Sequence, residues 1–275
     1  MKLGCHTITW GGVYGNPVGV TSTKDSTYLV PGDLSQALRE IAALGFDGIE
    51  LFDGNIDAWP GGLPALRELL TTLNLDLVAV YTGGSLVYDE ILPAELWRID
   101  RALANAAELG APHLVIGGGA QRHDRGADDA DYDRLARALD VIAETAAGRG
   151  VAAHYHPHLS TIAETPEQLE RVFSRTPIGF CPDTAHQAAA GGDPVELIRR
   201  YADRISYLHL KDARLDPLAF VPVGEGDLDI AGILAALDAV GFDGWLTLEL
   251  DSYDGEPGVA AEIGRDAVAR LRADV

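Results

Sequence analysis

Three histidines stand at every second position in HYHPH, residues 154–158. Successive side chains of a β-strand point to opposite faces, so His154, His156 and His158 would share one face of a strand here. Such spacing would allow several imidazole nitrogens to reach one cation. The alternative is a buried, hydrogen-bonded histidine beside a solvated one, because neutral imidazole is often buried. The choice depends on which side chains other strands bring to the same place.

Charged or metal-binding side chains also occur at the ends of other apolar runs. They are Glu50, Asp183, His209, Lys211, Glu249 and Asp251. An acid flanked by apolar neighbours, as in LTLELD, is costly to bury without a partner, and a cation would offset that cost. The alternatives are a structural ion pair between Glu249 and an arginine, and a hydrogen-bonded core position for His209.

His186 and Lys211 each have more than one interpretation. His186 comes three residues after Asp183 in FCPDTAHQ and could orient a metal ligand, contact a substrate or bind a second ion. Lys211 could hold a substrate oxygen or stabilise a developing enolate, and an ion pair with Asp212 or Asp251 is the alternative.

The mixture of carboxylate oxygens and imidazole nitrogens suits a transition-metal ion better than Ca²⁺, which prefers oxygen ligands alone. We expect one divalent ion, with Mn²⁺ first and Co²⁺, Fe²⁺, Zn²⁺ or Mg²⁺ as alternatives. Cys181 lies two residues before Asp183. We expect it to be a buried apolar side chain, which is the commoner state of a free cysteine.

Eight short runs rich in β-branched and apolar residues are candidate strands. They are residues 3–10, 47–51, 75–83, 112–118, 151–158, 178–184, 205–212 and 245–251. Segments with apolar residues at helical spacing lie between them, such as 34–45 and 96–110, each ending in or before a glycine. This alternation predicts a single (β/α)8 TIM barrel over residues 1–275. No GxGxxG or GxxxxGK[ST] follows a strand, which disfavours an open nucleotide-binding sheet.

The segments that follow three of the strands are long, at 11–30, 117–129 and 212–229. They would emerge at the carboxyl ends of the strands, where barrel enzymes place their active sites. The charged residues at the strand ends would gather at the same face.

Composition limits the partners and the compartment. The chain has 275 residues, 47% of them hydrophobic, and a formal net charge of −21 from 42 acidic and 21 basic residues. Its negative field disfavours nucleic acid and anionic membranes as partners. With two cysteines, no signal-peptide pattern and no apolar run near the roughly 20 residues that span a bilayer, we expect a cytoplasmic protein.

Five motifs together resemble the xylose isomerase-like barrel superfamily. They are GFDGIEL (45–51), CPDTAHQAAAGGDP (181–194), RISYLHLKD (204–212), VGEGDLD (223–229) and GWLTLELD (244–251). The superfamily includes sugar epimerases, hydroxypyruvate isomerase-like proteins, inosose dehydratases and the endonuclease IV group. The resemblance covers nearly the whole chain and implies a TIM barrel that acts on sugars or related compounds.

The resemblance also implies a ligand set for one divalent ion. Such proteins hold it with a glutamate, an aspartate, a histidine and a glutamate from strands five to eight. The last three match Asp183, His209 and Glu249. The first position departs from the pattern, because His156 stands where relatives often have glutamate. HYHPHLST instead resembles the corresponding stretch of inosose dehydratases and similar keto-sugar lyases. His156 therefore matches the ligand position, His158 is expected to face the substrate, and His154 to be structural.

This departure bears on the reaction. Superfamily epimerases are thought to use two metal-bound glutamates as bases on opposite faces of the substrate, whereas here Glu249 alone is a carboxylate. The hypothesis is that the ion binds a ketone and a neighbouring hydroxyl, Glu249 or a nearby base removes the α-proton, and the ion stabilises the enediolate. His156 or His158 would then protonate a leaving β-oxygen. The expected catalytic residues are Glu249, His158 and Lys211, and the expected substrate contacts are Glu50, His186, His6 and Trp10.

Three alternatives stay open at this point. A sugar isomerase or epimerase would use the same chemistry up to the enediolate. An endonuclease IV-like phosphodiesterase is disfavoured by the net charge of −21. A barrel that binds sugars without turning them over, or that works only with a partner subunit, is the third. We expect a small sugar or cyclitol as ligand and a homo-oligomeric assembly.

Overall fold

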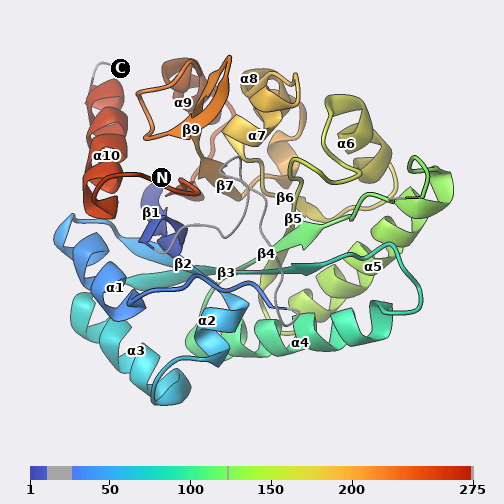
Figure 1. The fold of residues 1–275 in the computed structure, drawn as a ribbon, viewed down its shortest axis with the longest axis horizontal. Coiled ribbons are helices and arrows are strands. Elements are labelled where there is room, and N and C mark those ends of the chain that lie inside the picture. The colour runs from blue at the N-terminus through green and yellow to red at the C-terminus, as the bar shows by residue number, and fades with distance from the viewer. Residues whose placement is uncertain (11–26, 123, 274–275) are drawn as a thin grey trace.

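Eight apolar runs form the parallel strands of one sheet, and helices surround it (Figure 1). The computed structural model describes residues 1–10, 27–122 and 124–273. The strands are β1 (Lys2–His6), β2 (Gly48–Phe52), β3 (Asp76–Gly84), β4 (His113–Gly118), β5 (Ala152–His156), β6 (Gly179–Phe180), β7 (Tyr207–Leu210) and β10 (Trp245–Leu248). The antiparallel pair β8 (Asp212–Leu215) and β9 (Leu218–Val221) forms a separate hairpin after β7.

The order of the strands makes the sheet a nearly closed barrel. Its order is β6-β5-β4-β3-β2-β1-β10-β7, so β6 and β7 are the two ends. A parallel bridge between Asp183 and His209 joins these ends, and the backbone amide of His209 donates to the carbonyl of Pro182 at 2.9 Å. The predicted TIM barrel is confirmed, and its closing contact lies between two of the predicted metal ligands.

The helices connect successive strands and cover the outside of the barrel. They are α1 (Leu34–Ala43), α2 (Asp53–Asp57), α3 (Gly62–Leu73), α4 (Leu92–Leu109), α5 (Asp129–Ala147), α6 (Pro166–Phe173), α7 (Thr184–Ala189), α8 (Pro194–Arg200), α9 (Ile230–Ala239) and α10 (Pro257–Ala273), with short 3-10 helices η1 (Thr7–Trp10) and η2 (Ala202–Arg204). Gly110 ends α4 in the left-handed conformation, at φ 82°, as expected of a helix stop. No helix among these described residues is long and apolar enough to cross a membrane.

Several strands end earlier than the sequence indicated. The first strand stops at His6 and continues as η1, the fifth stops before Pro157, and the sixth has two residues. Proline offers no backbone N–H for a sheet ladder, which explains the ends at Pro157 and Pro182. Asp183 then begins α7 as its N-cap: its side chain accepts hydrogen bonds from the amides of Ala185 and His186. Asp183 and Glu249 therefore lie just beyond their strands, whereas His209 lies within β7.

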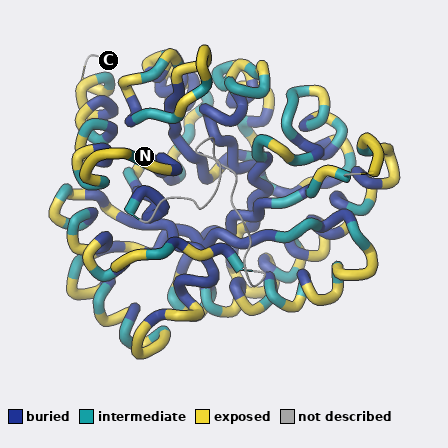
Figure 2. Tube along the Cα trace, viewed as in Figure 1, coloured by how far each residue is buried: buried dark blue, intermediate teal, exposed yellow. Residues whose placement is uncertain are grey.

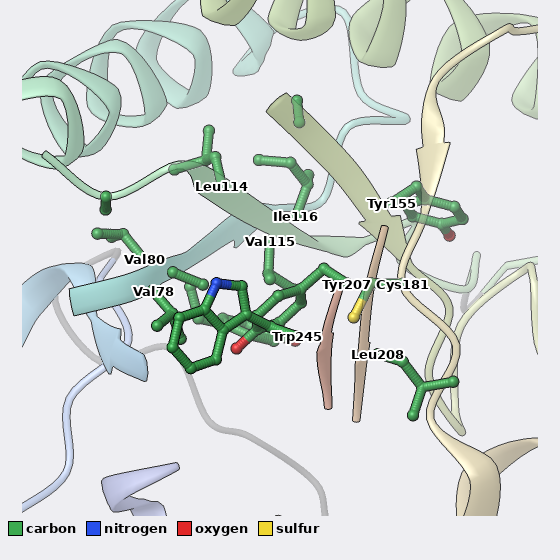
Figure 3. Close-up of a cluster of buried hydrophobic side chains, with 14 of the residues drawn as sticks. Val78, Val80, Leu114, Val115, Ile116, Tyr155, Cys181, Tyr207, Leu208 and Trp245 are labelled. Atoms are coloured by element: carbon green, nitrogen blue, oxygen red, sulfur yellow. The ribbon is translucent and has the colours of Figure 1, made fainter. Parts of the chain in front are cut away.

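The outward-facing side chains of the strands form the apolar layer beneath the helices. Figure 2 shows the strands as buried and the outer faces of the helices as exposed. Figure 3 shows part of this apolar core, to which several neighbouring strands contribute side chains, among them Val80, Leu114, Ile116 and Leu208. The inside of the barrel is more polar. The hydrogen bond between Tyr207 on β7 and Glu50 on β2 joins strands that are not neighbours, so it crosses the interior.

The close pairing of β3 and β4 at their carboxyl ends requires glycine. Gly83 pairs with Gly117, and a Cβ atom at Gly83 would collide with the carbonyl oxygen of Gly117. We expect Gly83→Ala to lower the free energy of unfolding by about 1–3 kcal/mol, because the backbone of β4 must move. Gly126→Ala is the control, since nothing lies within 4 Å of a Cβ there. Equal unfolding midpoints in urea for the two variants would contradict this account.

Candidate active site

Glu50 lies at the centre of a buried polar network inside the barrel. His209 Nε2 lies 3.0 Å from Glu50 Oε2, and the Tyr207 hydroxyl donates to the same oxygen. His6 Nε2 lies 3.2 Å from Oε1. Burial alone would raise the pKa of Glu50, but the charges and hydrogen bonds of His209 and His6 outweigh burial and hold it well below its usual range.

This network includes two residues that the sequence predicted as substrate contacts. Glu50 and His6 were expected to contact a substrate, yet both are buried and the polar contacts described for them are with protein atoms. His6 Nδ1 accepts the backbone amide of Ile8 at 2.9 Å, which leaves Nε2 as the protonated nitrogen facing Glu50. Glu50 thus contacts His209 directly, and His6 contacts Glu50.

Three buried polar atoms of different residues converge, and none of them has a hydrogen-bond partner among the described residues outside this group of three. They are Asp183 Oδ2, His209 Nδ1 and Glu249 Oε2. The side chains offer ligand atoms that all lie within 4.8 Å of one another, and His209 Nδ1 lies 2.6 Å from Glu249 Oε2. Asp183 Oδ1 is already used to cap α7, which leaves Oδ2 free. Buried carboxylate oxygens and an imidazole nitrogen that converge in this way fit a divalent cation, which would displace the proton on the nitrogen.

His156 lies next to this group at the end of β5. Its ring centroid is 4.8 Å from that of His209, and its Nδ1 atom is buried without a partner. Two other sets of possible ligands among the described residues contain it: one with Cys181 and His209, the other with His158 and His186. Burial, together with the charge of His209, lowers the pKa of His156, so its ring is neutral and able to bind a metal.

The rings of His158 and His186 lie against each other beside His156, tilted by 48°. Their ring centroids are 3.8 Å apart. His158 Nδ1 lies 2.8 Å from the carbonyl oxygen of Leu159. A carbonyl accepts but cannot donate, so Nδ1 carries a proton and Nε2 has a lone pair when the ring is neutral. Burial and the charge of Lys211 lower the pKa of His158, which favours this neutral form.

Lys211 is a fixed cation at the site. Its Nζ atom bonds Asp251 Oδ1 and lies 3.3 Å from Glu249 Oε1, 3.6 Å from Asp183 Oδ2 and 3.2 Å from His186 Nε2. Burial lowers the pKa of Lys211, but the three carboxylates raise it well above its usual value. Lys211 therefore stays protonated and cannot act as a base at neutral pH. The ion pair with Asp251, an alternative left open by the sequence, is confirmed.

Trp10 was also expected to contact a substrate. It lies in η1 and its indole nitrogen donates to Glu40 Oε2 on α1 at 2.5 Å, which ties the ring to a helix outside the barrel. His154 pairs with His113 instead, with 3.0 Å between ring nitrogens, on the inner wall of the barrel. This position matches the structural role expected for His154.

Residues 38–272 match the family described as Xylose isomerase-like TIM barrel. The chain belongs to this family. Rhizopine catabolism protein MocC of Rhizobium meliloti is 32% identical over 309 residues, covering 99% of this chain and 89% of that protein. Inosose dehydratase of Geobacillus kaustophilus is 28% identical over 270 residues, covering 86% of each. A solved structure titled IOLI protein with a binding zinc atom has a TM-score of 0.77 at 18% identity, covering 100% of this chain and 99% of that one.

Two residues that contact this xylose isomerase-like site were not predicted from the sequence. Tyr207 bonds Glu50 from across the barrel, and Phe220 of the β8–β9 hairpin covers Lys211, with Nζ 4.3 Å from the ring centroid. The alternation of apolar and polar residues along β7 places Tyr207 on the same face as His209, so a signal for Tyr207 was present. No local pattern indicated that the hairpin folds back onto Lys211.

Removing the Lys211 charge should destabilise the protein strongly. Lys211→Met would leave Asp183, Glu249 and Asp251 buried without their cation, so we expect a loss of about 3–5 kcal/mol in the free energy of unfolding, measured in urea with a chelator present. Lys2→Met is the control, because Lys2 is exposed, and it should change stability by less than about 1 kcal/mol. Similar losses in both variants would show that Lys211 does not balance the buried carboxylates.

Proposed function

We propose that the protein is a divalent-metal-dependent enzyme that enolises a keto-sugar or keto-cyclitol and then eliminates a β-oxygen. The observation that carries the proposal is the convergence of three buried atoms, Asp183 Oδ2, His209 Nδ1 and Glu249 Oε2, which have no hydrogen-bond partner outside their own group in the described part of the chain, beside a neutral histidine, His158. The similarity to a protein named inosose dehydratase supports a keto-cyclitol as substrate and dehydration as the reaction.

The proposed ligands are Asp183, His209 and Glu249, with His156 as the fourth. Mn²⁺ suits this set of carboxylates and neutral imidazoles, and Co²⁺, Fe²⁺, Zn²⁺ and Mg²⁺ are the alternatives. When bound, such an ion acts as a Lewis acid that polarises a carbonyl oxygen of the substrate. Glu50 holds His209 Nε2 at 3.0 Å, which directs Nδ1 toward the carboxylates, and this nitrogen gives up its proton when it binds an ion.

The proton-transfer groups of this site are Glu249 and His158. Burial raises the pKa of Glu249, but the charges of Lys211 and His209 outweigh burial and keep it an ionised carboxylate. His158 Nε2 has a lone pair in the neutral ring, so either group can accept the α-proton. A proton taken up by His158 Nε2 is then available for the leaving β-oxygen. His158 would thus act first as a base and then as the acid that the sequence predicted.

Lys211 and His186 complete the proposed site as positioning and substrate-binding groups. Lys211 holds Glu249 Oε1 at 3.3 Å and remains charged throughout the reaction. Its ammonium also donates toward His186 Nε2 at 3.2 Å, which places the proton of His186 on Nδ1. That N–H is buried without a partner and is available to a substrate oxygen.

An isomerase or epimerase is the second candidate function. Glu249 follows β10 and His158 follows β5, so two proton acceptors reach the site from separate strands of the barrel. Two acceptors from different directions also suit the transfer of a proton between faces or carbons of a substrate. The product separates the two candidates: loss of water indicates the lyase, and an isomeric ketose indicates the isomerase.

Solvent deuterium exchange into a panel of inososes, ketoses and 3-keto-glycosides tests the proposal. We expect exchange at the α-carbon that requires Mn²⁺, because enolisation needs both the ion and a base. His158→Gln should lower the exchange rate about 10²- to 10⁴-fold while one ion per chain still binds. Asp183→Ala and Glu249→Ala should lose the ion, as measured by metal analysis of the purified variants.

The matched control for these variants is Asp129→Ala, which removes an exposed carboxylate on α5. It should change neither metal content nor exchange. Exchange that persists in metal-free protein, or a complete lack of exchange and turnover across the panel, would overturn the proposed function.

A further inference from the structure

A cavity of about 460 Å³ opens beside the candidate active site. Its wall includes His158 and Tyr81, and these two side chains also contact the site itself. The ring of His158 contacts that of His186, and the ring centroid of Tyr81 lies 5.5 Å from that of His156. The volume falls in the range of about 300–1,000 Å³ that is usual for small-molecule sites. A ligand that reacts near His158 can therefore extend into this cavity.

Arg98 of α4 is one of the residues that line the cavity. One of its terminal nitrogens donates to the carbonyl oxygen of Gly83 at 2.6 Å, and its Nε atom is buried without a partner. No carboxylate forms an ion pair with Arg98 within the described part of the chain. Arg101, one turn further along α4, is bonded to Asp57 instead. A half-buried arginine without an acid partner is unexpected in a chain with twice as many acidic as basic residues.

The carboxylates nearest to Arg98 are already engaged elsewhere. Glu95 accepts the backbone amides of Ser85 and Leu86 at 2.6 and 3.0 Å, one on each oxygen. These hydrogen bonds hold Glu95 to the chain that follows β3. Its charge is thus partly compensated by the two amides, and its oxygens are not directed at the guanidinium.

Asp53 is the second nearby acid, close enough for the charge of Arg98 to affect it. Its oxygens accept hydrogen bonds from the amides of Tyr28 and Gly54 and from the hydroxyl of Thr82, at 2.8–2.9 Å. Neither acid therefore neutralises Arg98 by contact. The guanidinium keeps donors for a ligand.

We propose that Arg98 forms an anion subsite in this cavity, which binds a carboxylate or phosphate group on the substrate at a distance from its reacting carbonyl. The inference rests on the proposed function, because it describes the substrate of the same site. A net charge of −21 repels an anionic ligand at long range, so a specific cation is needed to retain one. Guanidinium suits this task, because it forms paired, charge-assisted hydrogen bonds with both groups.

Three ketoses that differ at their terminal carbon test the subsite: D-fructose, D-fructose 6-phosphate and D-fructuronate. Inorganic phosphate is a fourth, minimal probe. Each is titrated calorimetrically into the metal-loaded wild-type protein and into Arg98→Gln, Arg98→Lys and Arg101→Gln. Arg101→Gln is the matched control, since it removes the same charge from the same helix outside the cavity.

We expect at least one anionic ketose to bind the wild type about 10-fold or more tightly than D-fructose. Arg98→Gln should weaken that binding about 10- to 100-fold and leave D-fructose unchanged, because a charge-assisted hydrogen bond is lost. Arg98→Lys should retain part of the preference, and Arg101→Gln all of it. The preferred ketose identifies phosphate or carboxylate as the group that Arg98 binds.

Anion binding that Arg98→Gln does not change, or an absence of binding by all the anionic probes, would overturn the subsite. An equal loss of all ligands, D-fructose included, would also overturn it, because it would indicate a general disturbance of β3. Deuterium exchange measured on the same samples reports on the proposed function separately. If exchange occurs but no anion binding depends on Arg98, the subsite alone is rejected. If anion binding depends on Arg98 but no substrate exchanges, the proposed function alone is rejected.

Discussion

The structure depends on the compensation of charge that is buried at the carboxyl ends of the strands. Glu50, Asp183, Glu249 and Asp251 are all buried there, and carboxylates removed from water need partners. Lys211 contacts three of them, and His209 contacts Glu50 and Glu249. After these contacts Asp183 Oδ2 has no hydrogen bond, and among the described residues Glu249 Oε2 faces only His209 Nδ1. A divalent ion at this point would complete the compensation.

The same residues close the barrel. β6 contributes two residues to the sheet, and the bridge from Asp183 to His209 joins its end to β7. The backbone of this junction thus holds two proposed ligands side by side, while the cap of α7 fixes one oxygen of Asp183 and Glu50 fixes one nitrogen of His209. Binding geometry and fold closure are consequently set by one small group of contacts. An ion bound there would stabilise the folded state by mass action.

Much of this arrangement could be predicted from the sequence. The eight strands and the gathering of Asp183, His209 and Glu249 follow from the alternation of elements, because the carboxyl ends of parallel strands meet at one face. The role of Glu50 could not be predicted, since it depends on contacts across the barrel that local patterns do not encode. The same is true of Trp10: no pattern showed that the strand ends at His6 and turns the indole toward α1.

Asp183, His209 and Glu249 are proposed to bind one divalent ion. Anomalous X-ray diffraction from crystals grown with Mn²⁺, recorded at the manganese edge, tests it most directly. The account predicts a single strong peak bonded to Asp183 Oδ2, His209 Nδ1 and Glu249 Oε2, with His156 completing the set. A peak among His156, His158 and His186 that touches neither carboxylate, or crystals without a peak at saturating Mn²⁺, would contradict it.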